Sequence, residues 1–191
     1  DNILICPPTY GMYAISAETC DVGVKKVALN DDFGLNVNAI CAEEDVNIIF
    51  ICAPNNPTGT SVAREDIKTV LEHFADTALV VVDEAYIEFD ASNTWATEIA
   101  NYTNLVVLRT LSKAFALAGL RCGFTLAQEP VIQALLKVIA PYPIPEPVAQ
   151  IAANALSSDS LALIALQVDT INREKEALAE SLAAIEGFTL V

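Results

Sequence analysis

The stretch Leu79-Val-Val-Val-Asp-Glu-Ala-Tyr86 gives the clearest indication of the fold. It joins a continuous apolar run, residues 79–82, directly to a polar cluster. A short apolar run rich in β-branched residues is typical of a strand covered on both faces, as in a parallel sheet with helices on either side. The stretch therefore predicts a buried strand with Asp83 just beyond its end.

Five more apolar runs of this kind lie on either side of that stretch, at residues 3–6, 24–29, 48–52, 105–108 and 123–126. Apolar side chains also repeat over residues 67–74 with the spacing of an amphipathic helix, and Ser61 ahead of them is a residue type that caps helices. Strands and helices in this arrangement predict a three-layer α/β fold, doubly wound around a mostly parallel sheet.

The last third of the chain predicts two further helices. Apolar residues recur with helical spacing over 131–139, and the Pro-Tyr-Pro-Ile-Pro run from Pro141 predicts a loop after them. A second apolar stripe over 161–185 predicts a long helix, with Gly187 as its stop signal, before a strand over 188–191. We expect a large domain over residues 1–157, and over 158–191 a long bridging helix with the start of a smaller domain.

The composition favours a globular protein and argues against two classes of partner. Hydrophobic residues make up 53% of the chain and charged residues 18%, which suits a packed core rather than disorder. A formal net charge of −15 repels phosphate backbones and anionic lipid surfaces, so we expect no nucleic-acid and no membrane partner. Because the chain starts without Met and enters an apolar run at once, we expect a piece of a longer protein.

The cysteines and the single histidine predict no metal site. The five cysteines are scattered and mostly embedded in apolar runs, without the paired spacing of a zinc site. We interpret them as reduced residues of the core, which favours a cytoplasmic protein. His73 has no second histidine to act with, and we expect it at the surface.

Polar clusters follow four of the predicted strands, at residues 7–10, 54–59, 83–86 and 109–113. Ligands of doubly wound sheets bind beyond the carboxyl ends of the strands, so these clusters form the candidate site. Together with Arg121 they offer an amine, a carboxylate, hydroxyls, an amide and a guanidinium. Enzymes that use pyridoxal 5′-phosphate (PLP) need such a set, for the aldehyde, the pyridine nitrogen, the phenolic oxygen and the phosphate.

The charged residues of these clusters have both a catalytic and a structural interpretation. Asp83 would pair with a pyridinium in a low dielectric, or would cap the next loop. Lys113 would be nucleophilic if desolvated near cations, whereas a lysine after a strand is most often a solvated surface charge. Arg121, at the start of a buried strand, needs an anion there. That anion is either a phosphate, which the hydroxyls of Ser112 and Thr110 would also bind, or a structural carboxylate.

The uncharged residues of these clusters also have both a ligand-binding and a structural interpretation. The turn Asn56-Pro-Thr-Gly59 would present the Asn56 amide to a ligand oxygen, and a plain turn has the same sequence. Tyr86 would place its phenol near that oxygen and Tyr10 would stack on a pyridine ring, or both are core tyrosines. Glu84 is adjacent to Asp83 and would point away from it, so the two predict no hydrolase acid–base pair.

The order of these motifs resembles the fold-type I PLP-dependent aminotransferases over essentially the whole chain. Pro-Asn-Asn-Pro-Thr-Gly, Asp-Glu-Ala-Tyr and Thr-Leu-Ser-Lys follow one another, with Arg121 eight residues after the lysine. Residues 6–13 and 110–123 are most similar to the histidinol-phosphate aminotransferases. The resemblance implies amino transfer between L-histidinol phosphate and 2-oxoglutarate in histidine biosynthesis, by a homodimer whose active site is completed across the interface.

The same resemblance implies a role for each candidate residue. Lys113 would form the Schiff base with PLP and then move a proton between the substrate α-carbon and C4′ of the cofactor. The remaining contacts with PLP would be Asp83 at the pyridine nitrogen, Asn56 and Tyr86 at the phenolic oxygen, Ser112 and Arg121 at the phosphate with Thr110 as a weaker candidate, and Tyr10 on the ring face.

Relative to that family, the chain lacks an upstream glycine-containing segment and most of the small domain, which carries the arginine that grips the substrate. Several alternatives therefore stay open: an aromatic aminotransferase, a threonine-phosphate decarboxylase, or a catalytically inactive fragment that binds PLP. An ordinary nucleotide-binding domain has little support, because neither GxGxxG after the first strand nor GxxxxGK[ST] is present.

Overall fold

The computed structural model describes residues 1–187, which divide into two compact units. Unit 1 comprises Asp1–Thr110 and Gly123–Pro143, and unit 2 comprises Leu111–Cys122 and the residues from Ile144 onward. The strand predicted over 188–191 lies outside the described residues. The predicted domain boundary at residue 157 stays a prediction.

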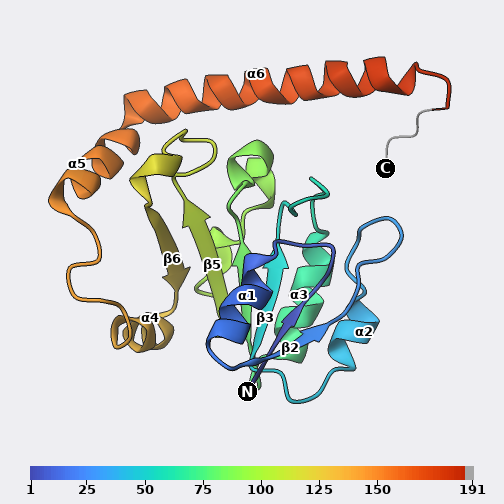
Figure 1. Cartoon of the computed structure of the whole chain (residues 1–191), viewed down its shortest axis with the longest axis vertical. Coiled ribbons are helices and arrows are strands. Elements are labelled where there is room, and N and C mark those ends of the chain that lie inside the picture. The colour runs from blue at the N-terminus through green and yellow to red at the C-terminus, as the bar shows by residue number, and fades with distance from the viewer. Residues whose placement is uncertain (188–191) are drawn as a thin grey trace. The chain divides into compact units, whose positions relative to one another are not determined.

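A six-stranded sheet forms the centre of unit 1, in the order β2-β1-β3-β4-β5-β6 (Figure 1). The first five strands pair in parallel, and the sixth pairs antiparallel with the fifth. All six predicted strands and the mostly parallel α/β sheet are confirmed. The strands are β1 Asn2–Ile5, β2 Gly23–Lys26, β3 Ile48–Cys52, β4 Leu79–Asp83, β5 Leu105–Thr110 and β6 Gly123–Ala127.

Helices cover both faces of this sheet. Ile67 and Val70 of α3 are fully buried in one core cluster, whereas Tyr13 and Ala17 of α1 belong to another. The two clusters take alternate residues of β1 and β3, which point to opposite faces of a sheet. The three-layer prediction is therefore confirmed. The helices of unit 1 are α1 Met12–Thr19, α2 Val37–Cys41, α3 Arg64–His73 and α4 Glu129–Leu136, with 3-10 helices η1 Ile87–Asn93 and η2 Ala96–Glu98.

Burial on both faces was expected of every strand, and this is wrong for the two edge strands. The inner strands are mostly buried, but β2 is exposed at both of its ends, and Gly123 and Phe124 of β6 are exposed. An edge strand has one neighbour only and is covered less completely. Its position depends on the order of the strands, which the apolar runs do not reveal.

Two helix boundaries in unit 1 differ from the predicted ones. The N-cap of α3 is Ala63 rather than Ser61, and Ser61 Oγ instead donates a hydrogen bond to Asp90 Oδ2 at 2.6 Å. The helix over 131–139 ends earlier, at Leu136. Its C-cap is Lys137.

Unit 2 contains η3 Ala118–Leu120, α5 Glu146–Ala155 and α6 Ser158–Ala183. The predicted long helix is confirmed as α6, which begins after Ser157, whose side chain accepts a hydrogen bond from the Ser160 amide. No helix was predicted where α5 lies. Pro145 and Pro147 do not prevent it, because they stand at its N-cap and in its first turn, where a helix tolerates proline.

No single helix within residues 1–187 is long and apolar enough to cross a membrane, although the bent pair α5 and α6 meets that test jointly, by length and composition alone.

The five cysteines form no disulfide with one another, and not all of them lie in the core. Cys6 and Cys52 are buried, and burial raises the pKa of the Cys6 thiol to about 12. Cys20 is exposed at the end of α1, so the prediction of a core residue is wrong there. His73 is exposed, as expected.

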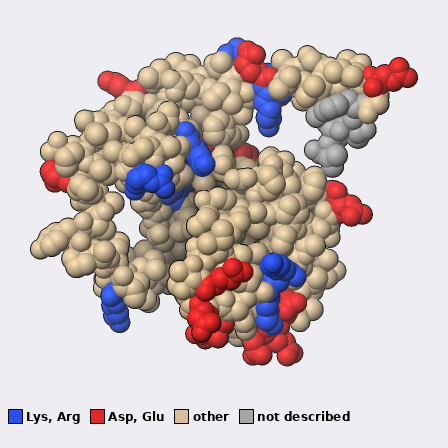
Figure 2. All heavy atoms as spheres, in the orientation of Figure 1, with Lys and Arg blue, Asp and Glu red and all other residues tan. Residues whose placement is uncertain are grey.

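Acidic side chains gather near the N-terminus of the chain, on the face that Figure 2 shows. Residues 43–45, between α2 and β3, contribute three of them, and Lys25 Nζ lies 3.2 Å from Glu43 Oε2. These residues lie at the amino ends of the strands. The candidate site lies at the opposite edge of unit 1, where the strands end.

Candidate functional site

The carboxyl ends of β1, β3 and β4 bring three of the predicted polar clusters together in unit 1. The strands run in parallel, and the last residues of β3 and β4, Cys52 and Asp83, are partners in the register. The loops that follow these strands therefore lie at the same edge of the sheet. Hydrogen bonds at this edge join residues that are 30 to 70 positions apart in the chain.

Asp83 ends β4 and is 9% exposed. The Tyr13 hydroxyl donates a hydrogen bond to Asp83 Oδ2 at 2.6 Å, and the Ala85 amide donates one to Oδ1 at 3.1 Å. With a donor on each oxygen, the carboxylate is held in one orientation. Tyr13 was not among the predicted site residues. Its only signal in the sequence is its position three residues after Tyr10.

The turn after β3 is fixed by Asn55, another residue that sequence reasoning missed. Asn55 is 6% exposed, and its Nδ2 donates to Pro8 O at 2.9 Å and to Thr58 Oγ1 at 2.8 Å. Its Oδ1 accepts from Thr9 Oγ1 at 3.0 Å. These bonds tie the loop after β1 to the turn after β3. They leave the neighbouring Asn56 to face a different partner.

Asn56 and Tyr86, predicted to bind one ligand oxygen, are in contact. Asn56 Nδ2 lies 3.3 Å from the Tyr86 hydroxyl, and both residues are half-buried. An amide donor and a phenol thus stand together beside the end of β4. Tyr10 is 43% exposed and lies nearly perpendicular to the ring of Tyr13, with ring centroids 5.5 Å apart. Stacking of Tyr10 on a planar ligand stays a prediction.

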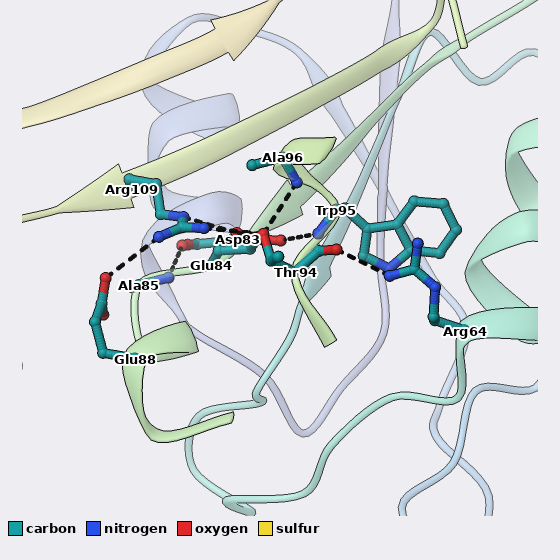
Figure 3. A network of polar contacts seen from close by, with 9 residues as sticks. All are labelled: Arg64, Asp83, Glu84, Ala85, Glu88, Thr94, Trp95, Ala96 and Arg109. Atoms are coloured by element: carbon teal, nitrogen blue, oxygen red, sulfur yellow. Dashed lines mark hydrogen bonds and ion pairs between the residues drawn. The ribbon is translucent and has the colours of Figure 1, made fainter. Parts of the chain in front are cut away.

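Glu84 turns away from Asp83 into a separate network (Figure 3). Its side chain is fully buried and accepts hydrogen bonds from Arg109 Nε at 2.7 Å, from Thr94 Oγ1 at 3.1 Å and from the Trp95 amide. The expectation that Asp83 and Glu84 form no acid–base pair agrees with this geometry. Glu84 has a structural role instead: its hydrogen bonds connect the end of β4 to β5 and to the turn between η1 and η2.

Arg109 also reaches a second carboxylate in this network. Its Nη1 lies 3.4 Å from Glu88 Oε1, and its Nη2 donates to Thr94 Oγ1 at 2.9 Å. Glu88 Oε2 is buried and has no hydrogen-bond partner within the described residues. Burial accordingly raises the pKa of the Glu88 carboxyl, against the opposing charge of Arg109.

Ser112 and Lys113 belong to unit 2, in the segment that follows β5 along the chain. The segment is anchored by Leu111, which is 1% exposed and whose amide donates to Cys122 O at 3.0 Å. Lys113 is exposed and Ser112 half-buried, and Lys113 O accepts from the Ala116 amide at 2.8 Å. The desolvation expected of Lys113 is therefore not seen in this chain.

Arg121 ends the same segment, and its side chain is exposed. Its Nη1 donates to Ala118 O at 2.8 Å. The prediction of an anion there rests on burial, and burial of Arg121 is not seen in this chain. Thr110, the last residue of β5, is half-buried in unit 1. The roles of these residues toward a phosphate stay predictions.

The described part of the chain holds no group of His, Cys, Asp and Glu that could bind a metal ion. In unit 1, the strand ends offer one oriented carboxylate, an amide–phenol pair, an exposed tyrosine ring and the Thr110 hydroxyl. The amine of Lys113, the hydroxyl of Ser112 and the guanidinium of Arg121 belong to unit 2.

Comparisons with known proteins agree on one family. The family model Aminotransferase class I and II matches residues 1–191. The chain is 68% identical over 192 residues to the histidinol-phosphate aminotransferase of Pseudoalteromonas atlantica. The matched region covers 100% of this chain and 52% of that protein. The chain thus spans about half the length of the curated relatives it matches.

Solved structures share the fold. The histidinol-phosphate aminotransferase from Clostridium acetobutylicum matches with a TM-score of 0.87 and 25% identity, over 99% of this chain and 59% of that one. An L-threonine-O-3-phosphate decarboxylase from Porphyromonas gingivalis matches with a TM-score of 0.80 and 22% identity, over 97% and 55%. The second likeness concerns the fold alone, so the fold does not distinguish the two reactions.

Proposed function

Since the chain belongs to the class I and II aminotransferases, we propose that the intact protein uses PLP to move the amino group of L-histidinol phosphate to 2-oxoglutarate. The observation that carries the proposal is the 68% identity, over the whole chain, to the Pseudoalteromonas atlantica protein of that name. The reaction is a step of histidine biosynthesis. Because the chain spans about half of its relatives, the activity is assigned to the intact protein.

The chain carries the set of donor groups that PLP needs. Asp83 supplies an oriented and nearly buried carboxylate for the pyridine nitrogen, and the Asn56–Tyr86 pair supplies donors for the phenolic oxygen. Lys113 supplies the amine, three residues after the end of β5. The remaining groups are the hydroxyls of Ser112 and Thr110 with the Arg121 guanidinium for the phosphate, and the Tyr10 ring for stacking.

Each side chain would contribute a separate function. When bound, PLP supplies a sink for the electron pair that the substrate α-carbon gains on losing its proton. Lys113 would hold the cofactor covalently and would then take and return that proton. Asp83 would keep a proton on the pyridine nitrogen, because a nearby carboxylate in a low dielectric favours the charged partner. Arg121 and the hydroxyls would hold the phosphate in place throughout.

The proposal predicts a preference among amino donors. With 2-oxoglutarate as acceptor, the intact protein should form glutamate from L-histidinol phosphate with a kcat/KM at least about 100-fold above that for aromatic amino acids, because a site that pairs with a polar substrate group rejects analogues lacking it. Initial rates of glutamate formation measure this. Equal rates with aromatic donors would favour an aromatic aminotransferase, and release of CO₂ from O-phosphothreonine a decarboxylase; either result would contradict the proposed substrate.

The proposal extends to the partners and setting of the intact protein: a homodimer in the cytoplasm that acts on small molecules, without nucleic acid or membrane. Cysteines that form no disulfide with one another suit a reducing compartment. Val138 and Tyr142, after α4, are 81% and 95% exposed, and large exposed apolar side chains often mark an interface. Light scattering should give the mass of two chains, and a monomer at assay concentration would contradict the dimer.

A further inference from the structure

Tyr13 is held on several sides within unit 1. Its ring stacks on Phe50 of β3, with centroids 4.7 Å apart and planes at 15°, and packs against the edge of Tyr10. The residue is 6% exposed. Because packing restrains the ring, the hydroxyl has little freedom to leave Asp83 Oδ2, 2.6 Å away.

The hydrogen bond has a fixed donor. Burial, and after it the charge of Asp83, raises the pKa of the Tyr13 phenol far above its ordinary value. The phenol therefore stays protonated and donates. The distance of 2.6 Å between the Tyr13 hydroxyl and Asp83 Oδ2 falls in the range of about 2.5–2.7 Å that is typical of a hydroxyl bound to a carboxylate ion.

The carboxylate of Asp83 keeps capacity for a further partner. Two carboxylate oxygens offer about four acceptor positions, and the Tyr13 hydroxyl and the Ala85 amide use one on each oxygen. These two donors restrict rotation of the carboxylate about the bond to its Cβ atom. A ligand N–H would therefore meet an acceptor whose orientation is already set, and binding would cost less conformational entropy.

We propose that Tyr13 is a positioning residue, whose hydroxyl orients the Asp83 carboxylate toward the pyridine nitrogen of PLP. The inference rests on the proposed function, because that function gives Asp83 its partner. It predicts an effect that depends on the ring nitrogen, since Tyr13 acts through Asp83. A tyrosine that served only packing would affect every ligand of the site alike.

The test compares PLP with its 1-deaza analogue, in which a C–H group replaces the pyridine nitrogen. Both are titrated into the cofactor-free intact protein, as wild type and as Tyr13→Phe, which keeps the contacts with Phe50 and Tyr10. We expect PLP to bind the variant about tenfold more weakly, equivalent to about 1.4 kcal/mol, as for loss of a hydrogen bond to a charged group. The analogue should bind both proteins equally.

Further variants serve as controls for this comparison. Tyr102→Phe removes a phenol elsewhere in unit 1, beside Trp95, and should leave both affinities unchanged. In an Asp83→Asn background, Tyr13→Phe should have no further effect on PLP binding. Melting of the cofactor-free proteins checks folding, and Tyr13→Met makes the same comparison if the phenylalanine variant does not fold.

Each outcome separates this inference from the proposed function. If wild type binds PLP at Lys113 but Tyr13→Phe weakens PLP and the analogue equally, or weakens neither, the inference is wrong and the proposed function stands. A wild-type protein that binds no PLP would overturn both.

Discussion

Replacing Lys113 by alanine is expected to lower kcat for amino transfer by the intact protein by about 10⁴-fold and to abolish covalent attachment of PLP. The lysine amine would make the bond to the cofactor and then move the α-proton of the substrate. Alanine can do neither. The measurements are glutamate formation and the visible absorption of the protein after incubation with PLP, followed by borohydride reduction and peptide mass spectrometry.

A matched control is Lys175→Ala, since Lys175 is an exposed lysine of α6 in the same unit. It should keep both the activity and the label. In the wild type, reduction should trap the cofactor on the peptide that contains Lys113. A label on a different lysine, or a Lys113→Ala protein that still transfers amino groups, would refute the assignment.

The second large effect concerns stability. Arg109→Met is expected to lower the free energy of unfolding by about 3–5 kcal/mol, because it leaves a buried carboxylate without its cation. Glu84 is fully buried, and the Arg109 side chain is 20% exposed. Thr94 and the Trp95 amide still donate to Glu84, but they carry no charge that offsets it. Urea denaturation of the cofactor-free intact protein, followed by tryptophan fluorescence at Trp95, measures the loss.

Two comparisons test the cause of that loss. Lys68→Met removes a cation whose partner Glu65 lies 3.8 Å away, with both side chains largely exposed, and should cost less than about 0.5 kcal/mol. Glu84→Gln combined with Arg109→Met should recover part of the stability, because glutamine is neutral and still accepts from the Trp95 amide. If Arg109→Met costs no more than Lys68→Met, the buried pair is not the source of stability.

Two predictions from the sequence fail for the same reason. The neighbours of Ser61 predict an N-cap, but Ser61 pairs with Asp90, 29 residues away. The apolar run from Gly123 predicts a buried strand, but Gly123 and Phe124 are exposed. In both cases the local pattern was correct as a pattern. The hydrogen-bond partner of Ser61 and the burial of the start of β6 depend on segments far away in the sequence, which a local pattern does not include.

The sequence by itself determined the strands, the polar clusters at their ends and the family, because these depend on side-chain type and on short spacings. An apolar run predicts a strand whatever position that strand takes in the sheet. A motif such as residues 110–113 is recognised from its residue types and their order alone. Asp83 and the Asn56–Tyr86 pair could therefore be named before any fold was known.

Only the tertiary structure decided which side chains meet. Tyr13 reaches Asp83 across 70 residues, and Arg109 reaches Glu84 across 25. Both contacts depend on the order and register in which parallel strands pair, and that order is set by packing of the whole sheet. Orientation and charge neutralisation at the strand ends are therefore properties of the assembled fold, whereas the chemical groups themselves are properties of the sequence.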